Sequence, residues 1–230
     1  MVWSPLTNGT SGNANRYSSR NGAKIDRFII HHGAQTNWAS FLATFAGGDW
    51  SVSPNYALGM GKIIGIVDEA LRAWTSSSAS WDGRAITVEV LNSSSNGWLV
   101  AENDFHNLAR LIADWAHRYK NAITNTTVIT HQELYLWYGA SYATQCPGSL
   151  QARKAELIAL ANRYRAGVPE VPATFWSAKR WIICVMCGSP PARRLSSRKT
   201  STFSTKSRPM NSPNRSTPDS TMLSVTTSCD

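Results

Sequence analysis

Short apolar segments of β type alternate with helical segments along residues 25–165, and this alternation constrains the fold more than any other feature. Apolar runs and a period of two predict strands at 25–30, at two places within 55–67, at 85–90 and at 127–130. Apolar residues at steps of three and four predict helices at 37–47, 102–120 and 149–165. Residues 1–24 are polar and predict an irregular arm. Strands that alternate with helices predict an α/β domain in which helices pack on a sheet.

The segment 85–90 predicts a strand with two different faces. Ile86, Val88 and Val90 share one face, and Thr87 and Glu89 share the other. One side of the strand is therefore apolar, and the other side presents a carboxylate.

Two of the five histidines lie in the helix predicted at 102–120. The apolar stripe of this helix predicts its buried face, and His106 and His117 lie off that stripe. We therefore expect both histidines on the solvated surface.

The basic charge of the 230-residue chain lies mostly in its C-terminal quarter. The formal net charge is +9, and residues 1–168 hold 14 of the 23 basic and 11 of the 14 acidic residues, which leaves +6 on residues 169–230. From Ser189 to Asp230, 18 of 42 residues are Ser or Thr. Such a segment buries too little apolar surface to offset its chain entropy. The sequence predicts a folded domain at 1–168 and a basic Ser/Thr-rich linker or disordered tail at 169–230. A frameshift near residue 175 would also give the composition of this tail.

The N-terminus and the cysteine count bear on the compartment in which the protein is made. The first 20 residues contain no apolar core of a secretory signal, and no apolar run reaches the roughly 18 residues that span a bilayer. The four cysteines are too few for a disulfide scaffold in a chain of this size. We therefore expect a soluble chain made in a reducing cytosol, with no membrane span.

Cys146 lies in the segment Thr-Gln-Cys-Pro-Gly, where it has three open roles: nucleophile, half of a disulfide, or metal ligand. A residue before proline favours extended geometry, which fixes the direction of the thiol. His31 ends one predicted strand and His131 follows another. Two histidines, a cysteine and a water form a catalytic zinc set. A buried cysteine with two packed histidines is the alternative interpretation.

Four blocks of sequence together resemble the zinc-dependent N-acetylmuramoyl-L-alanine amidases. The blocks are FIIHHGAQT, SPNYALGMGKIIGIVDEALRAW, AITVEVLNSS, and VITHQE followed by TQCPG, in the family's order between about residues 23 and 165. This family, amidase type 2, includes phage endolysins, bacterial autolysins and animal peptidoglycan recognition proteins. The resemblance implies a central mixed β-sheet flanked by helices, bound Zn²⁺, and hydrolysis of the amide between N-acetylmuramic acid and L-alanine in bacterial peptidoglycan.

The resemblance also implies which side chains hold the metal. The family's first zinc histidine falls on His31, its second on His131, and its thiolate on Cys146. His32 is the alternative to His31, because strand alternation allows only one of the two to face the metal.

Three catalytic side chains are implied in the same way. The family's active-site tyrosine falls on Tyr56, which would donate a hydrogen bond to the developing oxyanion. The glutamate of the bacterial branch falls on Glu89, which would accept a proton from water and pass it to the leaving amine. Thr144 takes the position two residues before the cysteine, where members have lysine or threonine, and is expected to position the water.

An amidase without an export signal is expected to be a phage or prophage endolysin. It would be made in the host cytoplasm and act on the cell wall after release, as a monomer with no nucleic-acid partner. Two other classes stay open: a non-catalytic peptidoglycan-binding module of the same fold, and a binder of anionic polymers through the basic tail. Metal analysis distinguishes the binding module from the amidase. Deletion of residues 169–230 distinguishes the anionic-polymer binder from the amidase.

Overall fold

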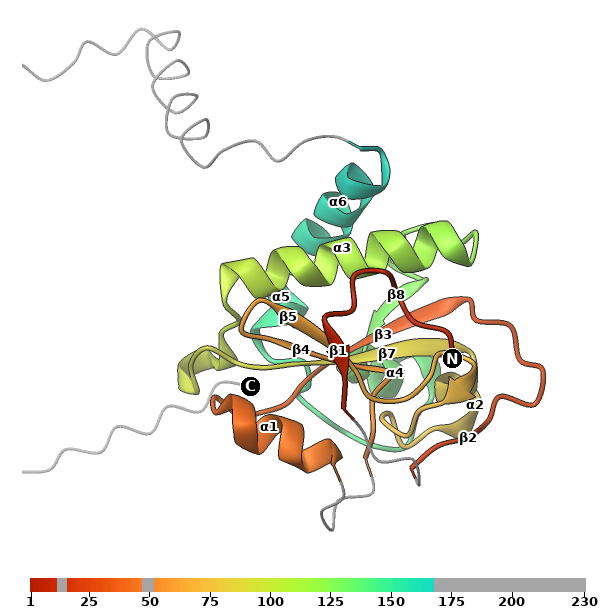
Figure 1. Cartoon of the computed structure of the whole chain (residues 1–230), viewed down its shortest axis with the longest axis horizontal. Coiled ribbons are helices and arrows are strands. Elements are labelled where there is room, and N and C mark those ends of the chain that lie inside the picture. Colours follow the sequence, from red (N-terminus) through yellow and green to blue (C-terminus); the bar gives the residue numbers. More distant parts are fainter. Residues whose placement is uncertain (12–15, 47–51, 168–230) are drawn as a thin grey trace, which may run out of the picture. The chain divides into compact units, whose positions relative to one another are not determined.

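A six-stranded mixed β-sheet forms the centre of the computed structural model of the chain (Figure 1), which describes residues 1–11, 16–46 and 52–167. The strands lie in the order β1 (Gly9–Thr10), β5 (Lys62–Gly65), β4 (Tyr56–Gly59), β7 (Ala85–Val90), β3 (Arg27–His32) and β8 (Val128–Thr130). Neighbouring strands are parallel, except that β4 and β5 form an antiparallel hairpin. Two short strands, β2 (Ser18–Ser19) and β6 (Leu71–Arg72), pair in a separate antiparallel sheet.

The helices of the described residues cover both faces of this sheet. They are α1 (Trp38–Phe45), α2 (Ala79–Gly83), α3 (Glu102–Arg118), α4 (His131–Tyr138), α5 (Ser149–Ala152) and α6 (Lys154–Arg165), with a 3-10 turn at Asn96–Trp98. Helices α3 and α6 lie together on one side of the sheet, and α1, α2 and α4 lie on the other (Figure 1). The prediction of a central mixed sheet flanked by helices is confirmed.

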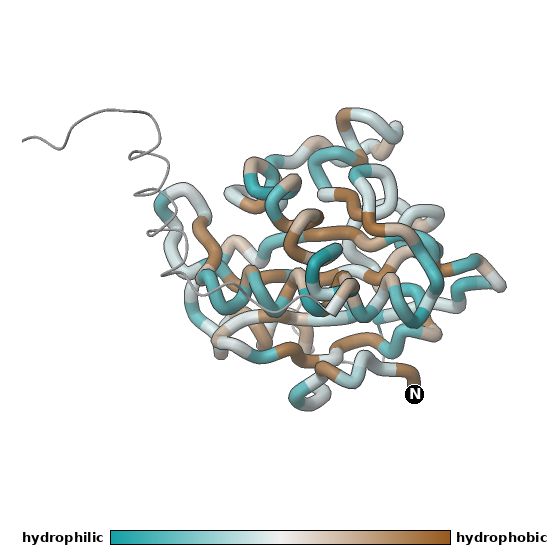
Figure 2. Tube along the Cα trace, turned by 90° about the horizontal axis from the view of Figure 1, so that it is seen from above, coloured by the Kyte–Doolittle hydropathy of each residue, from teal (hydrophilic) through white to brown (hydrophobic). Residues whose placement is uncertain are grey.

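The sheet face beneath α3 is the main hydrophobic core. Alternate residues of β3 and β7 point into it, and they pack against Trp115 of α3 and Leu157 of α6. The apolar face predicted for 85–90 is this one, because Ile86, Val88 and Val90 are all fully buried there. In Figure 2 the hydrophobic segments accordingly run through the middle of the molecule.

The opposite face of the sheet is covered by two smaller apolar clusters. Ile29 and Ile129 pack against Leu134 of α4, and Ala57 packs against Phe41 and Phe45 of α1. The side chains that alternate with the main core, among them that of Glu89, therefore emerge on this second face.

Most predicted elements lie where the sequence placed them, but the helix predicted at 149–165 divides into α5 and α6 at Arg153. One side chain on each side of this break contacts the start of α4. Gln151 hydrogen-bonds with Thr130, and Lys154 forms a buried ion pair with Glu133 at 2.5 Å. These contacts fasten the C-terminal helices to the point where β8 becomes α4.

Helix α4 has no counterpart among the predicted elements, although the sequence contains its start signal. Thr130 accepts a hydrogen bond from the backbone N–H of Glu133, and the Glu133 side chain accepts one from the backbone N–H of Thr130. This reciprocal capping box fixes the first turn of a helix. His131 is consequently the first residue of α4, held rigidly at the end of β8.

The remaining predictions have mixed outcomes. His117 is exposed as predicted, whereas His106 is half-buried and its Nδ1 lies 2.7 Å from the Tyr164 hydroxyl. The predicted tail at 169–230 lies outside the described residues, which end at Gly167. In the part of the chain that the structure describes, no helix is long and apolar enough to cross a membrane.

Candidate metal centre and active site

His31, His131 and Cys146 come together at the carboxyl ends of the parallel strands. One ligand atom from each lies within 4.8 Å of the others. His31 belongs to β3 and His131 directly follows β8, and these two strands are parallel neighbours. Because parallel strands end at the same edge of a sheet, side chains far apart in the sequence meet there. Two imidazoles and one thiolate are the donor set of a zinc site that keeps one coordination position open.

Glu89 lies beside this group because of the strand register. His31 of β3 pairs with Glu89 of β7, so both side chains point to the same face of the sheet. The His31 Nδ1 atom is 3.9 Å from the Glu89 Oε1 atom, and only 14% of the Glu89 side chain is exposed. A carboxylate thus stands next to the metal-binding group without belonging to it.

Backbone hydrogen bonds hold Cys146 in place. The His32 N–H donates to the Cys146 Sγ at 3.4 Å, and the Gln132 N–H donates to the Cys146 carbonyl oxygen at 2.8 Å. The backbone of Ser76 faces the His131 ring, where it opposes the lowering of the histidine pKa by burial. Contacts of this kind orient metal ligands and set the tautomer of a ligating histidine.

Three buried polar atoms at this site, two in the metal-binding group and one on the neighbouring Glu89, have no hydrogen-bond partner. They are Nε2 of His31, Nε2 of His131 and Oε2 of Glu89. A buried polar atom without a partner is costly, by about 1–3 kcal/mol each. A divalent cation satisfies the lone pairs of the two imidazole nitrogens directly, so the residues present fit a bound metal ion.

The electrostatics of the site also suit a cation. Burial lowers the pKa of His31 well below its usual value, with His131 and His32 adding to the effect, and lowers the pKa of His131 to about 4. Both imidazoles are therefore neutral, which is their metal-binding form. Burial raises the pKa of the Cys146 thiol, and it raises the pKa of Glu89 to about 8. A nearby divalent cation opposes both of these increases, because it favours the thiolate and the carboxylate.

A cavity of about 730 Å³ opens onto the metal-binding group. Glu89 and Thr144 line it, together with Tyr142, whose side chain is 54% exposed and whose ring stacks on His131 at a centroid distance of 5.6 Å. Thr144 Oγ1 accepts a hydrogen bond from the Cys146 N–H at 3.0 Å, which leaves the hydroxyl hydrogen able to point into the cavity. The volume is within the roughly 300–1,000 Å³ of ordinary ligand sites.

The N-acetylmuramoyl-L-alanine amidase family matches residues 21–149, which is more than half of the chain. The chain belongs to this amidase family. The match contains the whole metal-binding group, from His31 to Cys146. No curated protein matches the chain in sequence.

Solved structures show the same fold at low sequence identity. A mutant endolysin from Bacillus subtilis is 16% identical, with a TM-score of 0.54 over 68% of this chain and 99% of the other. The Staphylococcus aureus hydrolase AmiA, solved with its ligand, is 16% identical, with a TM-score of 0.56 over 73% of this chain and 88% of the other. The chain therefore spans nearly the whole length of these structures.

Of the two adjacent histidines in this amidase, His31 is the one whose ring joins His131 and Cys146. The His32 ring turns away toward Asn92, with Nδ1 3.0 Å from the Asn92 Oδ1, and packs edge-on against Trp98. Asn92 in turn donates from Nδ2 to the Trp98 carbonyl oxygen at 2.8 Å. His32 thus lines the cavity and contributes its backbone N–H, not its ring, to the position of Cys146.

The expectation that Tyr56 acts in the amidase site does not agree with the structure. Tyr56 is fully buried, and its register partner Val88 points into the main core beneath α3. Its hydroxyl donates to Glu69 Oε1 at 2.5 Å and accepts from the Ser4 N–H at 2.7 Å. Strand alternation therefore places Tyr56 on the opposite side of the sheet from the metal-binding group, where it fastens the N-terminal arm to the core.

Tyr56→Phe is expected to lower stability and leave catalysis intact. The change removes one hydrogen bond from the buried Glu69 carboxylate and leaves the Ser4 N–H without its acceptor, a loss of about 1–3 kcal/mol. Chemical denaturation measures the stability, and release of L-alanine amino groups from cell walls measures the rate. A tenfold loss of rate at full zinc content, with little change in stability, would contradict this structural role.

The sequence interpretation did not find three residues that shape this site. Ser76 faces the His131 ring, Asn92 holds the His32 ring, and Tyr142 stacks on His131. Tyr142 had one usable signal, since it lies four residues before Cys146 in a polar segment. Ser76 and Asn92 act through contacts between distant segments, which no local pattern reveals.

Proposed function

We propose that this chain is a zinc-dependent amidase that hydrolyses the bond between N-acetylmuramic acid and L-alanine in peptidoglycan. The observation that carries the proposal is the convergence of His31, His131 and Cys146 beside the separate carboxylate of Glu89. Membership of the amidase family supports the substrate class. A complete ligand set also favours catalysis over a binding module that has lost its metal.

Zinc, when bound, supplies a Lewis acid that lowers the pKa of a water molecule and polarises a carbonyl oxygen. His31, His131 and Cys146 would hold it, as neutral imidazoles and a thiolate. The remaining work falls to the protein's own groups. Glu89 and Thr144 are not part of the ligand set, so the role of each can be tested by substitution without removing the metal.

Glu89 is placed to move the proton. Its carboxylate lies next to His31, has one buried oxygen without a partner, and lines the cavity. It would accept a proton from the attacking water and deliver it to the amine nitrogen of L-alanine as the amide bond breaks. Thr144, with its hydroxyl hydrogen free to point into the cavity, would hold the water or the substrate oxygen in position.

The test of this function is the chemistry of the products. Purified protein with intact cell walls should release new N-terminal L-alanine amino groups, and it should release no new reducing sugar ends. The zinc content should be about one per chain, as a three-ligand catalytic site requires. Appearance of reducing ends, or of amino groups other than those of L-alanine, would assign a different bond.

A further inference from the structure

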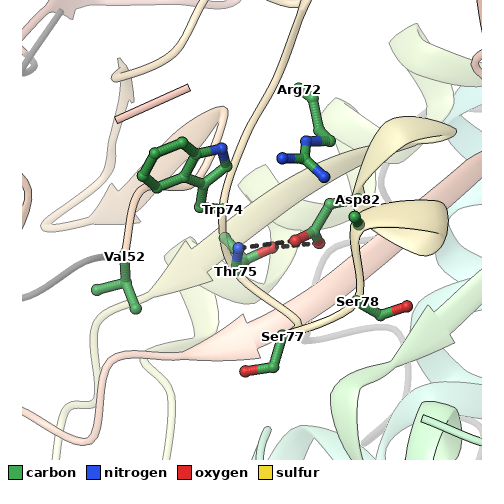
Figure 3. A pocket seen from close by; sticks show the side chains of 8 residues that line it. Val52, Arg72, Trp74, Thr75, Ser77, Ser78 and Asp82 are labelled. Atoms are coloured by element: carbon green, nitrogen blue, oxygen red, sulfur yellow. Dashed lines mark hydrogen bonds between the residues drawn. The ribbon is translucent and has the colours of Figure 1, made fainter. Parts of the chain in front are cut away.

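A second, smaller cavity adjoins the metal cavity. It measures about 220 Å³, and Arg72, Trp74 and Asp82 form part of its wall (Figure 3). Val52, Thr75 and Ser77 line both cavities. The two cavities thus share part of their walls, on Val52 and on the segment that follows β6.

One short segment separates the metal-binding group from the second cavity. On the metal side, the backbone of Ser76 faces the His131 ring and opposes the lowering of its pKa by burial. On the other side, the backbone N–H groups of Thr75 and Ser76 donate to the Asp82 carboxylate at 3.1 and 3.2 Å. The Thr75–Ser76 segment thus lies between the His131 ring and Asp82, which lines the second cavity.

Asp82 is fully engaged in holding this segment. Its Oδ1 accepts from the Thr75 hydroxyl at 2.9 Å and from the Ser76 N–H, and its Oδ2 accepts from the Thr75 N–H. The residue is only 3% exposed. Asp82 therefore organises the wall and offers little to a ligand.

Asp82 and Arg72 are the two charged residues that line this cavity, and of the two Arg72 is available to bind a ligand. Its Nη2 donates to the Ser18 Oγ at 2.8 Å, and the Trp74 Nε1 donates to the same oxygen at 2.8 Å, so one hydroxyl orients both side chains. Figure 3 shows the guanidinium directed toward the space between Trp74 and Asp82. Arg84, Arg118 and Arg153 each pair with a carboxylate. Arg72 forms no such pair within residues 1–11, 16–46 and 52–167.

We propose that Arg72 binds a carboxylate of the peptide stem of peptidoglycan in the second cavity, which makes the site selective for acidic stems. The inference rests on the proposed amidase function. A guanidinium matches a carboxylate in geometry and charge. In a muramoyl peptide the lactyl carboxyl is consumed in the scissile amide, so the remaining carboxylates belong to the peptide. A cavity of about 220 Å³ also accepts one amino-acid side chain more readily than a substituted sugar.

The inference predicts the direction of the substrate. The scissile amide lies in the metal cavity, the peptide passes the Thr75–Ser78 segment, and its acidic side chain reaches Arg72. The sugar then occupies the other end of the metal cavity, away from Val52 and Ser77.

The experiment compares N-acetylmuramoyl-L-alanyl-D-glutamate with its diamide, which lacks both carboxylates. Wild-type protein should prefer the diacid by about tenfold or more in kcat/KM, mainly through a lower KM, because a hydrogen bond to a charged group contributes that much binding. Arg72→Gln should remove this preference, so that the variant hydrolyses the diacid and the diamide with similar kcat/KM. Arg72→Lys, which keeps the charge without the planar fork, should retain part of it.

Arg163→Gln on α6 is the matched control, because it removes one positive charge on the other side of the sheet and should keep the full preference. Zinc content and melting temperature establish that each variant is folded and loaded. Equal hydrolysis of diacid and diamide by wild-type protein, or a preference that survives in Arg72→Gln, overturns the inference. If Arg72→Gln does not fold, undiminished preference in Arg72→Lys overturns it.

The proposed function fails in a different way. Wild-type protein would then release no L-alanine amino groups from cell walls or from either soluble substrate. If walls alone are hydrolysed, walls with chemically amidated stem carboxylates replace the diamide, and the same comparison of variants decides the role of Arg72.

Discussion

Cys146→Ser is expected to abolish zinc binding and wall hydrolysis together. Cys146 supplies the single thiolate of the group that its Sγ forms with His31 and His131. A serine hydroxyl is a weak zinc ligand at neutral pH, and even changes beyond the ligands cost 10–100-fold in metal affinity. We therefore expect zinc affinity to fall by about 100-fold or more, and activity to fall with it. Metal analysis after dialysis and release of L-alanine amino groups measure the two losses.

The chain offers a matched control for this change. Cys229→Ser replaces another cysteine of the chain and should keep both zinc and activity. Cys146→Ser should fold, because the contacts of the residue 146 backbone with Gln132 and Thr144 do not involve sulfur. Circular dichroism checks the fold of each variant. A folded Cys146→Ser protein that retains zinc and hydrolyses walls at the normal rate would refute the whole assignment.

The approach of His31, His131 and Cys146 to one another was predictable in part, because each of them is marked locally in the sequence. His31 ends an apolar strand, His131 follows another, and Cys146 precedes a proline. Parallel strands bring their carboxyl ends to one edge, so His31 and His131 had a physical reason to meet. The alternation of residues 85–90 likewise placed Glu89 on the face opposite the apolar one. The register of β3 and β7 then pairs Glu89 with His31, so the two side chains lie together.

Tyr56 shows where such reasoning stops. Its side chain faces the main core because β4 pairs with β7 in the register that sets Tyr56 against Val88 and Ala57 against Glu89. A shift of one residue would have exchanged the two faces. Nothing in the segment around Tyr56 determines this register, which depends on contacts between strands distant in sequence. The cavity at Arg72 was missed for the same reason, since its wall joins β6 to α2 and its arginine is oriented by Ser18 of β2.

Glu89→Gln is expected to separate metal binding from catalysis. Glu89 is not one of the three ligands, so the variant should keep about one zinc per chain. Glutamine has nearly the same shape, and it replaces a buried carboxylate with a neutral group, so the fold should be at least as stable. It cannot accept the proton from water, and loss of a general base typically costs 10²–10⁴-fold in rate. Zinc content, wall binding and release of L-alanine amino groups are to be measured on one sample.

Glu102→Gln is the matched control for this prediction. Glu102 begins α3, its side chain is 62% exposed, and its ion pair with Arg153 lies at the surface, so its loss should change the rate little. The comparison also distinguishes two explanations for any loss in Glu89→Gln. If zinc content falls together with the rate, Glu89 supports the metal, and the loss of zinc itself accounts for the loss of rate. If zinc and wall binding persist while hydrolysis proceeds at a near-normal rate, Glu89 is not the general base, and the cavity beside His31 must supply that group from another side chain.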